Sequence, residues 1–202
     1  MVKYTFSVAA VLVAALSSVQ AHFQLTYPAP RGPFSENLEP IAPCSSYGVT
    51  SNRTEFPISK GFLEINSEHV QYTYTVHLAL SSNPGAADFT AQNTTVYNGT
   101  NSFPEQACLP ADLSKVSGIA DGTNATLQIV YNAGDDILYQ CADVVLKTSP
   151  AGWNASACTN ANGASTSSGS SGNSTSSSSA SALTASSALV ALGVVFAAVS
   201  QF

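Results

Sequence analysis

The chain of 202 residues contains three histidines, His22, His69 and His77, and one of them stands at a special position. Residues 1–21 have the features of a secretion signal, with a basic Lys3, an apolar run over residues 6–16 and a cleavage point after Ala21. Cleavage there makes His22 the first residue of the mature protein. Its α-amino group, with an ordinary pKa of about 7.7–8.0, could then chelate one metal ion together with its own imidazole.

A second imidazole would complete a T-shaped plane of three nitrogen ligands. Such a plane suits Cu(II), which also stands at the top of the divalent affinity series, whereas Zn²⁺ prefers a tetrahedron. We prefer His69 as this ligand, because it lies at the mouth of a predicted strand, where a loop can carry it over a sheet edge. His77 lies well inside the same strand and is the alternative.

A carboxylate in the segment 139–146 is a third candidate ligand. In a strand, Asp143 shares a face with Cys141, and a buried carboxylate requires a partner. A hydrogen-bonded anchor for a loop is one interpretation. Because the chain has only six Lys and Arg, we favour the other, in which Asp143 closes a metal site axially.

Strands are expected to position these residues. Residues 70–80 alternate apolar and polar side chains, as in a half-buried antiparallel strand. Shorter runs at 62–65, 126–131 and 137–146 also favour strands, with a hairpin connection at 132–136 and a short helix around 110–116. The pattern predicts an all-β sandwich formed by one domain, residues 22–160.

Four cysteines in a secreted chain predict two disulfides. Spacing alone permits three pairings. We favour Cys44–Cys158, which would join both ends of the domain, together with Cys108–Cys141, which would join a loop to a core strand. The chain contains no C-x-x-C pair, which argues against a zinc ribbon.

The remaining sequence signals indicate a cell-surface glycoprotein. N-glycosylation motifs occur at Asn52, Asn93, Asn98, Asn124 and Asn154. Residues 161–173 form a Ser/Gly-rich stalk, and residues 174–202 resemble a glycosylphosphatidylinositol (GPI) anchor signal with attachment at Asn173. The protein would contact the membrane only through this lipid, at the extracellular face of the plasma membrane or in the cell wall.

Composition excludes several classes of protein. Charged residues make up 9% of the chain and the formal net charge is −6, so a nucleic acid is a poor partner. A cytosolic enzyme does not fit the targeting signals. The sequence contains neither a G-x-S-x-G nor an H-E-x-x-H motif, and we assign no catalytic residue.

Taken together, several motifs resemble those of one family, the fungal copper-binding relatives of lytic polysaccharide monooxygenases, also called copper acquisition factors. The motifs are the HFQLTYP segment starting at His22, the PRG at 30–32, the APC at 42–44, the NRTEFP at 52–57, His69, the CADV at 141–144 and the anchor-like tail. The resemblance implies a flattened immunoglobulin- or fibronectin-III-like β-sandwich with long loops. It also implies a copper histidine brace, with His22 and His69 in the plane and Asp143 at the axial position.

We therefore expect a monomeric cell-surface protein that binds one Cu(II) ion and serves copper uptake or homeostasis, with a plasma-membrane copper transporter as a partner. An axial carboxylate favours Cu(II) and occupies a position that oxygen would need, which argues against polysaccharide cleavage. Two alternatives stay open: a copper-dependent monooxygenase acting on a cell-wall polymer, and a metal-free GPI-anchored adhesion glycoprotein.

Overall fold

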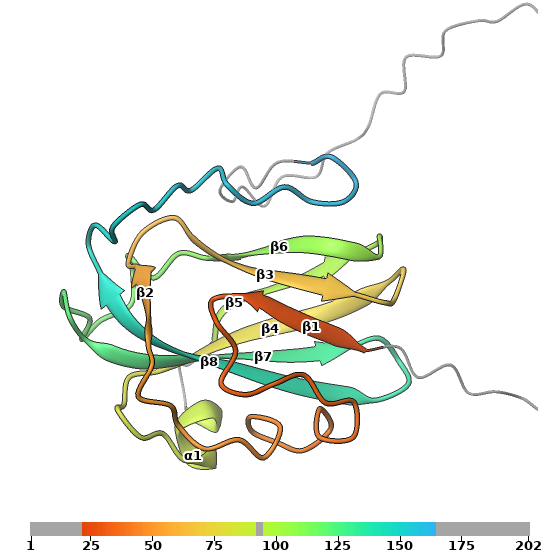
Figure 1. Cartoon of the computed structure of the whole chain (residues 1–202), viewed down its shortest axis with the longest axis horizontal. Helices are drawn as coiled ribbons and strands as arrows, with labels where there is room; N and C mark the ends of the chain where they lie inside the picture. Colours follow the sequence, from red (N-terminus) through yellow and green to blue (C-terminus); the bar gives the residue numbers. More distant parts are fainter. Residues whose placement is uncertain (1–21, 92–94, 165–202) are drawn as a thin grey trace, which may run out of the picture. The chain divides into compact units, whose positions relative to one another are not determined.

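The computed structural model describes residues 22–91 and 95–164. Two β-sheets face each other across an apolar core, and the described residues contain one helix of a single turn or so (Figure 1). The all-β sandwich with long loops and two disulfides is thus confirmed. The predicted signal segment, the anchor signal with Asn173, and Asn93 lie outside the described residues.

The smaller sheet has the strand order β1-β3-β6 and is antiparallel throughout. The larger sheet has the order β2-β8-β7-β4-β5 and is antiparallel except for the β2–β8 pair. Such an arrangement is of the immunoglobulin type. The strands are β1 (Phe23–Tyr27), β2 (Thr54–Pro57), β3 (Gly61–Ser67), β4 (Tyr72–Ala79), β5 (Thr95–Asn101), β6 (Glu105–Ala111), β7 (Asn124–Asn132) and β8 (Ile137–Lys147).

The strands predicted from alternation are confirmed, and their apolar faces form the core. In β4 the side chains of Tyr72, Tyr74, Val76 and Leu78 are buried between the sheets, as the period of two requires. Burial of such side chains from both sheets is the main stabilising term of the sandwich. Strands β1, β2, β5 and β6 were not predicted from the sequence, although β1 alternates buried and exposed side chains.

The predicted helix around residues 110–116 is wrong. Residues up to Ala111 belong to β6, and turns follow, with the Val116 N–H bonded to the Leu113 carbonyl. The helix of the described residues is α1 (Ala86–Thr90), whose Asp88 carboxylate accepts the Gly85 N–H at 2.7 Å. Such a cap at the N-terminus allows a short helix to form even though its sequence has no helical hydrophobic periodicity.

The predicted disulfide pairing is also wrong: the bonds join Cys44 to Cys141 and Cys108 to Cys158. Along β8, Ala142 and Val144 face the core between the sheets, so Cys141 points to the outer face of the larger sheet. The connection of residues 28–53 lies on that face and supplies Cys44. Cys158 instead meets β6 of the smaller sheet, which explains why it cannot pair with Cys44.

The connection 28–53 also covers the half of the β8 edge that β2 leaves unpaired. β2 pairs with residues Val144–Lys147 of β8, and the earlier half of β8 bonds to the connection: the Tyr139 N–H donates to the Glu39 carbonyl, and the Arg31 N–H donates to the Cys141 carbonyl. Covering an edge in this way protects its unpaired backbone groups. It also fixes the side chains that the connection carries.

No helix within the described residues is long and apolar enough to cross a membrane.

Candidate metal-binding site

His22 stands immediately before β1 and is almost completely buried, at 7% exposed. Strand pairing places it there: Phe23 lies opposite Ser67 of β3, and the Glu68 N–H donates to the His22 carbonyl at 3.0 Å. The start of β1, the end of β3 and the turn between β7 and β8 meet at this end of the sandwich (Figure 1). The pairing of β1 with β3 therefore fixes the position of His22, the first predicted metal ligand.

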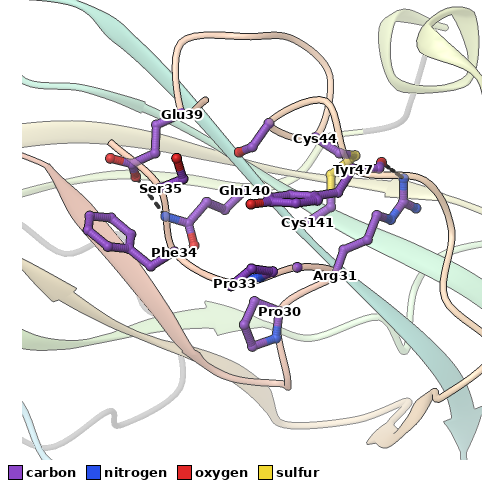
Figure 2. Close-up of a pocket in the computed structure, with 12 residues that line it drawn as sticks. Pro30, Arg31, Pro33, Phe34, Ser35, Glu39, Cys44, Tyr47, Gln140 and Cys141 are labelled. Carbon is purple, nitrogen blue, oxygen red and sulfur yellow. Dashed lines mark hydrogen bonds between the residues drawn. A yellow bond between two sulfur atoms is a disulfide. The ribbon is translucent and has the colours of Figure 1, made fainter. Parts of the chain in front are cut away.

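The His22 imidazole is oriented by a buried carboxylate from the connection 28–53. Its Nδ1 lies 2.7 Å from Oε2 of Glu39, and Oε1 of Glu39 accepts a hydrogen bond from Gln140 Nε2 at 2.6 Å (Figure 2). Gln140 in turn bonds the backbone of β1 at Phe23 and Leu25. With Glu39 ionised, Nδ1 is the donor and the second ring nitrogen, Nε2, has a free lone pair in the neutral ring.

Burial raises the pKa of Glu39 to about 6, although hydrogen bonds from Gln140 and His22 act in the opposite direction. Its side chain is only 1% exposed. A carboxyl group in this position keeps a negative charge at neutral pH because it has two donors. The negative charge favours a cation at the adjacent imidazole.

His69 follows β3 and lies at the same end of the sandwich. Its Nε2 is 3.0 Å from Oδ2 of Asp135, which belongs to the turn between β7 and β8. Its ring also lies against Tyr131, with centroids 6.3 Å apart. Glu68, the neighbour of His69, is 3.4 Å from the backbone nitrogen of His22.

A cavity of about 170 Å³ lies beside His22 and Asp135. Its lining includes His22, Glu36, Asp135 and Asp136. Asp135 therefore contacts the His69 ring and borders the same cavity as His22. Four carboxylates within or beside this region, from Glu36, Glu39, Asp135 and Asp136, create a negative potential that attracts cations.

Asp143 does not belong to this cluster of contacts. It is 1% exposed and lies under the connection 28–53, where Arg31 donates two hydrogen bonds to it, at 2.6 and 2.9 Å. The Thr126 hydroxyl donates at 2.6 Å and the Thr50 N–H at 2.9 Å. The premise that Asp143 lacks a cationic partner is wrong, and the alternative interpretation, a hydrogen-bonded anchor for a loop, describes its contacts.

The electrostatics of Asp143 agree with this structural role. Burial by itself raises the pKa of the carboxyl, but the hydrogen bonds from Arg31, Thr126 and Thr50 outweigh it and lower the pKa below the usual range. Such a carboxylate stays ionised and fully engaged with its donors. A metal would have to displace Arg31 to reach it.

His77 lies away from the other two histidines, in the middle of β4. Its Nδ1 is 3.2 Å from the Thr95 hydroxyl of the neighbouring strand β5, and burial lowers its pKa. Its backbone pairs with Gln128 of β7 on the other side. The structure thus brings His69, and not His77, to the end of the sandwich where His22 lies.

Sequence reasoning did not identify Glu39, Glu68 and Asp135 as members of this region. Glu39 lies in a segment without periodicity, so no pattern indicated its burial. Asp135 lies in the predicted hairpin connection 132–136, where its Oδ1 accepts the Asp136 N–H at 2.9 Å. The signal that could have found it is the position of its turn, which a hairpin of β7 and β8 must bring to one end of the sheet.

The donor set fits Cu(II) in type, since His22 and Asp135 line one cavity and Asp135 contacts the imidazole of His69. Within residues 22–91 and 95–164, however, no group of three or more His, Cys, Asp and Glu side chains lies close enough to hold a metal ion. Chelation by His22, His69 and Asp135 would therefore require these side chains to move closer together, with a further ligand, the backbone nitrogen, supplied by His22. Its Nδ1 must also leave Glu39, since a small chelate ring with the amine can form only through that nitrogen.

The model of the copper acquisition factor BIM1-like domain family matches residues 20–163. The match spans His22, both disulfides and the whole described sandwich. The chain belongs to the BIM1-like copper acquisition factor family. The resemblance inferred from the motifs is therefore confirmed.

Individual relatives agree with this assignment. The chain is 34% identical over 164 residues to copper acquisition factor BIM1 of Cryptococcus neoformans var. grubii, covering 77% of this chain and 74% of the relative. To the protein of the same name from C. neoformans var. neoformans it is 35% identical, covering 64% and 62%. A lytic polysaccharide monooxygenase-like protein, X325, of Hypocrea jecorina is 24% identical, covering 67% of each.

Proposed function

We propose that this protein binds one Cu(II) ion at its processed N-terminus and serves copper acquisition at the cell surface. The ligands are the amine and imidazole of His22, the imidazole of His69 and the carboxylate of Asp135. The observation that carries the proposal is the position of Asp135, which contacts His69 at 3.0 Å and borders the cavity at His22. Membership of a copper acquisition factor family supports the choice of metal.

Asp135 replaces Asp143 in the predicted ligand set. Asp143 is engaged by Arg31, Thr126 and Thr50, and removing it from these donors would leave a buried cation unpaired, which costs several kcal/mol. The Asp135 carboxylate contacts the imidazole of His69, itself a candidate ligand, and its side chain is 30% exposed. A cation can therefore reach Asp135 without disturbing the core.

Copper cargo explains the negative charge at this end of the molecule. Glu36 lies 3.8 Å from Nε2 of His22, and Glu68 lies 3.4 Å from its backbone nitrogen. Carboxylates that surround a site without all binding the ion raise the local concentration of cations. They also orient the histidine rings, as outer-shell carboxylates do in metal sites.

The rim of the site offers a surface for a recipient of the copper. Phe34, whose ring lies 6.2 Å from that of His22, is 38% exposed, and Val70, next to His69, is 68% exposed. Apolar side chains around a polar site are typical of contact surfaces. A copper transporter at the plasma membrane is the partner we propose, with the protein tethered there as a monomer through a GPI lipid.

The main test combines N-terminal sequencing with Cu(II) titration of the processed protein made from the full chain. We expect a single N-terminus at His22 and one Cu(II) bound per chain. His22→Ala and His69→Ala should each weaken binding by more than the 10–100-fold typical of outer-shell changes, and the matched control His77→Ala should not. An N-terminus other than His22, or equal losses for His69→Ala and His77→Ala, would contradict the proposal.

Electron paramagnetic resonance of the bound Cu(II) identifies the ligands. We expect nitrogen couplings from three donors in the wild-type protein and from fewer in His69→Ala. Monooxygenase activity is the second candidate, favoured by the similarity to the X325 protein. Oxidised oligosaccharides released from a wall polymer in the presence of a reductant would establish it, and their absence is the expected result.

A further inference from the structure

An aromatic groove lies at the other end of β1, away from the candidate metal site. Three rings form its floor: Phe62 and Trp153, with centroids 4.8 Å apart, and Tyr27, 5.8 Å from Trp153. Its volume is about 540 Å³, within the range of about 300–1,000 Å³ for small-molecule sites. The carboxylates of Glu55 and Glu64 lie along its sides.

Asn154 is part of the wall of this groove and is the first residue of an N-x-S motif. Two contacts fix its position: its Oδ1 accepts the Ser156 N–H at 3.0 Å, and its carbonyl accepts the Ala157 N–H at 3.0 Å. Cys158, which follows directly, is bonded to Cys108 of β6. A group attached to Asn154 is therefore held beside Trp153.

We propose that Asn154 carries an N-linked glycan whose first sugar lies in the aromatic groove and covers Trp153. In the transfer, Nδ2 of Asn154 forms a bond to C1 of an oligosaccharide as the C1–O bond to a lipid-linked diphosphate breaks. The amide loses one proton, and the diphosphate leaves with the electron pair of the broken bond. No oxidant or reductant is required.

The chemistry of the groove suits a sugar. The C–H face of a pyranose ring packs on aromatic rings, and its hydroxyl groups donate to carboxylates. Glu55 uses Oε2 to accept the Ala151 N–H, and Glu64 uses Oε1 to accept the Thr26 hydroxyl. Each carboxylate has a second oxygen with which it can accept from a sugar.

The glycan on Asn154 is a better occupant than a free polysaccharide because it is tethered. A covalent link converts binding into an intramolecular event at a high effective concentration. The aromatic contact then adds to the bonds that join the segment after β8 to the sandwich, among them the Cys108–Cys158 disulfide and the hydrogen bond from the Ala161 N–H to the Gln106 carbonyl. Asn98, on the edge strand β5, carries a second motif and provides a comparison site away from Trp153.

Two single substitutions each remove one glycosylation motif without changing either asparagine. Ser156→Ala removes the motif at Asn154, and Thr100→Ala removes the motif at Asn98. Trp153 is the only tryptophan in the chain, so its fluorescence reports on the groove alone. Mass spectrometry of the secreted full chain measures the loss of each glycan, and Ser156→Thr keeps the motif and serves as the conservative variant.

In Ser156→Ala we expect faster acrylamide quenching of Trp153 and a Tm lower by about 2–5 °C, the size of one lost aromatic contact in a domain of this length. Thr100→Ala and Ser156→Thr should match the wild type in quenching. An unmodified Asn154, or equal quenching in Ser156→Ala and wild type, would overturn the proposal. A third result would also overturn it: a soluble wall oligosaccharide that protects Trp153 of Ser156→Ala from acrylamide quenching as strongly as the tethered glycan does. That result would identify a free ligand in the groove.

Discussion

Asp135 and Asp143 belong to the same β7–β8 hairpin, yet their surroundings assign them opposite roles. Asp143 is buried under the connection 28–53 and bound by Arg31, Thr126 and Thr50. Asp135 lies in the turn, partly exposed, against an imidazole and a cavity. The comparison teaches that a carboxylate buried against an arginine stabilises the fold, whereas a partly exposed carboxylate beside an imidazole and a cavity can bind a ligand.

The largest effect is expected where the buried ion pair is broken. Asp143→Ala leaves Arg31 buried without its partner, and we expect the free energy of unfolding to fall by about 3–5 kcal/mol. Urea denaturation followed by tyrosine and tryptophan fluorescence measures it. Asp136→Ala, in the exposed turn, is the control. A loss below about 1 kcal/mol for Asp143→Ala would show that the pair is not the anchor of the connection.

A smaller and different effect is expected at Asp135. Asp135→Asn should weaken Cu(II) binding about 10–100-fold and change the free energy of unfolding by no more than about 0.5 kcal/mol, as surface changes do. Calorimetric titration with Cu(II) and urea denaturation provide the two measurements. If Asp136→Asn, which keeps the same turn, weakened copper binding as much, Asp135 would have no special role.

The smallest effect concerns the pH dependence of stability in the metal-free protein. The pKa of Asp143 is lowered on folding, so its contribution is present above the ordinary value of about 3.9 and is lost as the pH falls through the lower folded value. The pKa of Glu39 is raised from 4.5 to about 6, so its contribution is present at lower pH and is lost as the pH rises through about 6.

Urea denaturation at a series of pH values separates these two carboxyls. Asp143→Asn should flatten the acid side of the stability profile, and Glu39→Gln should flatten the decline between pH 4.5 and about 6. The two variants are controls for each other, because each changes only its own side. Profiles that change together would mean that the connection 28–53 unfolds as one unit with both carboxyls.

Much of the sandwich could be predicted because its central strands repeat with a period of two. The alternation in β4 and the runs in β3, β7 and β8 identified the elements that form the core. The edge strands were missed because β1 and β2 are only five and four residues long, while a glycine in β5 and a proline in β6 interrupt the strand pattern. The predicted disulfide pairing was wrong because the sequence showed which residues share a strand face with Cys141. It did not show which face of the sheet the connection 28–53 covers.

The candidate site was also predictable from the sequence only in part. A histidine directly after a cleavage point, and a second one at the mouth of a strand, could be recognised from local sequence because their chemistry depends on position in the chain. Which carboxylate accompanies them could not. Arg31 lies far from Asp143 in the sequence, and only the packing of the connection against β8 brings them to 2.6 Å.

The sequence by itself determined the all-β class and the family, since these depend on residue types and short-range order. The tertiary structure decided which aspartate is buried, which histidine meets the N-terminal end and which cysteines pair. The physical reason is that burial and pairing are properties of contacts between distant segments, and a long connection without periodicity contains no local signal of what it will cover.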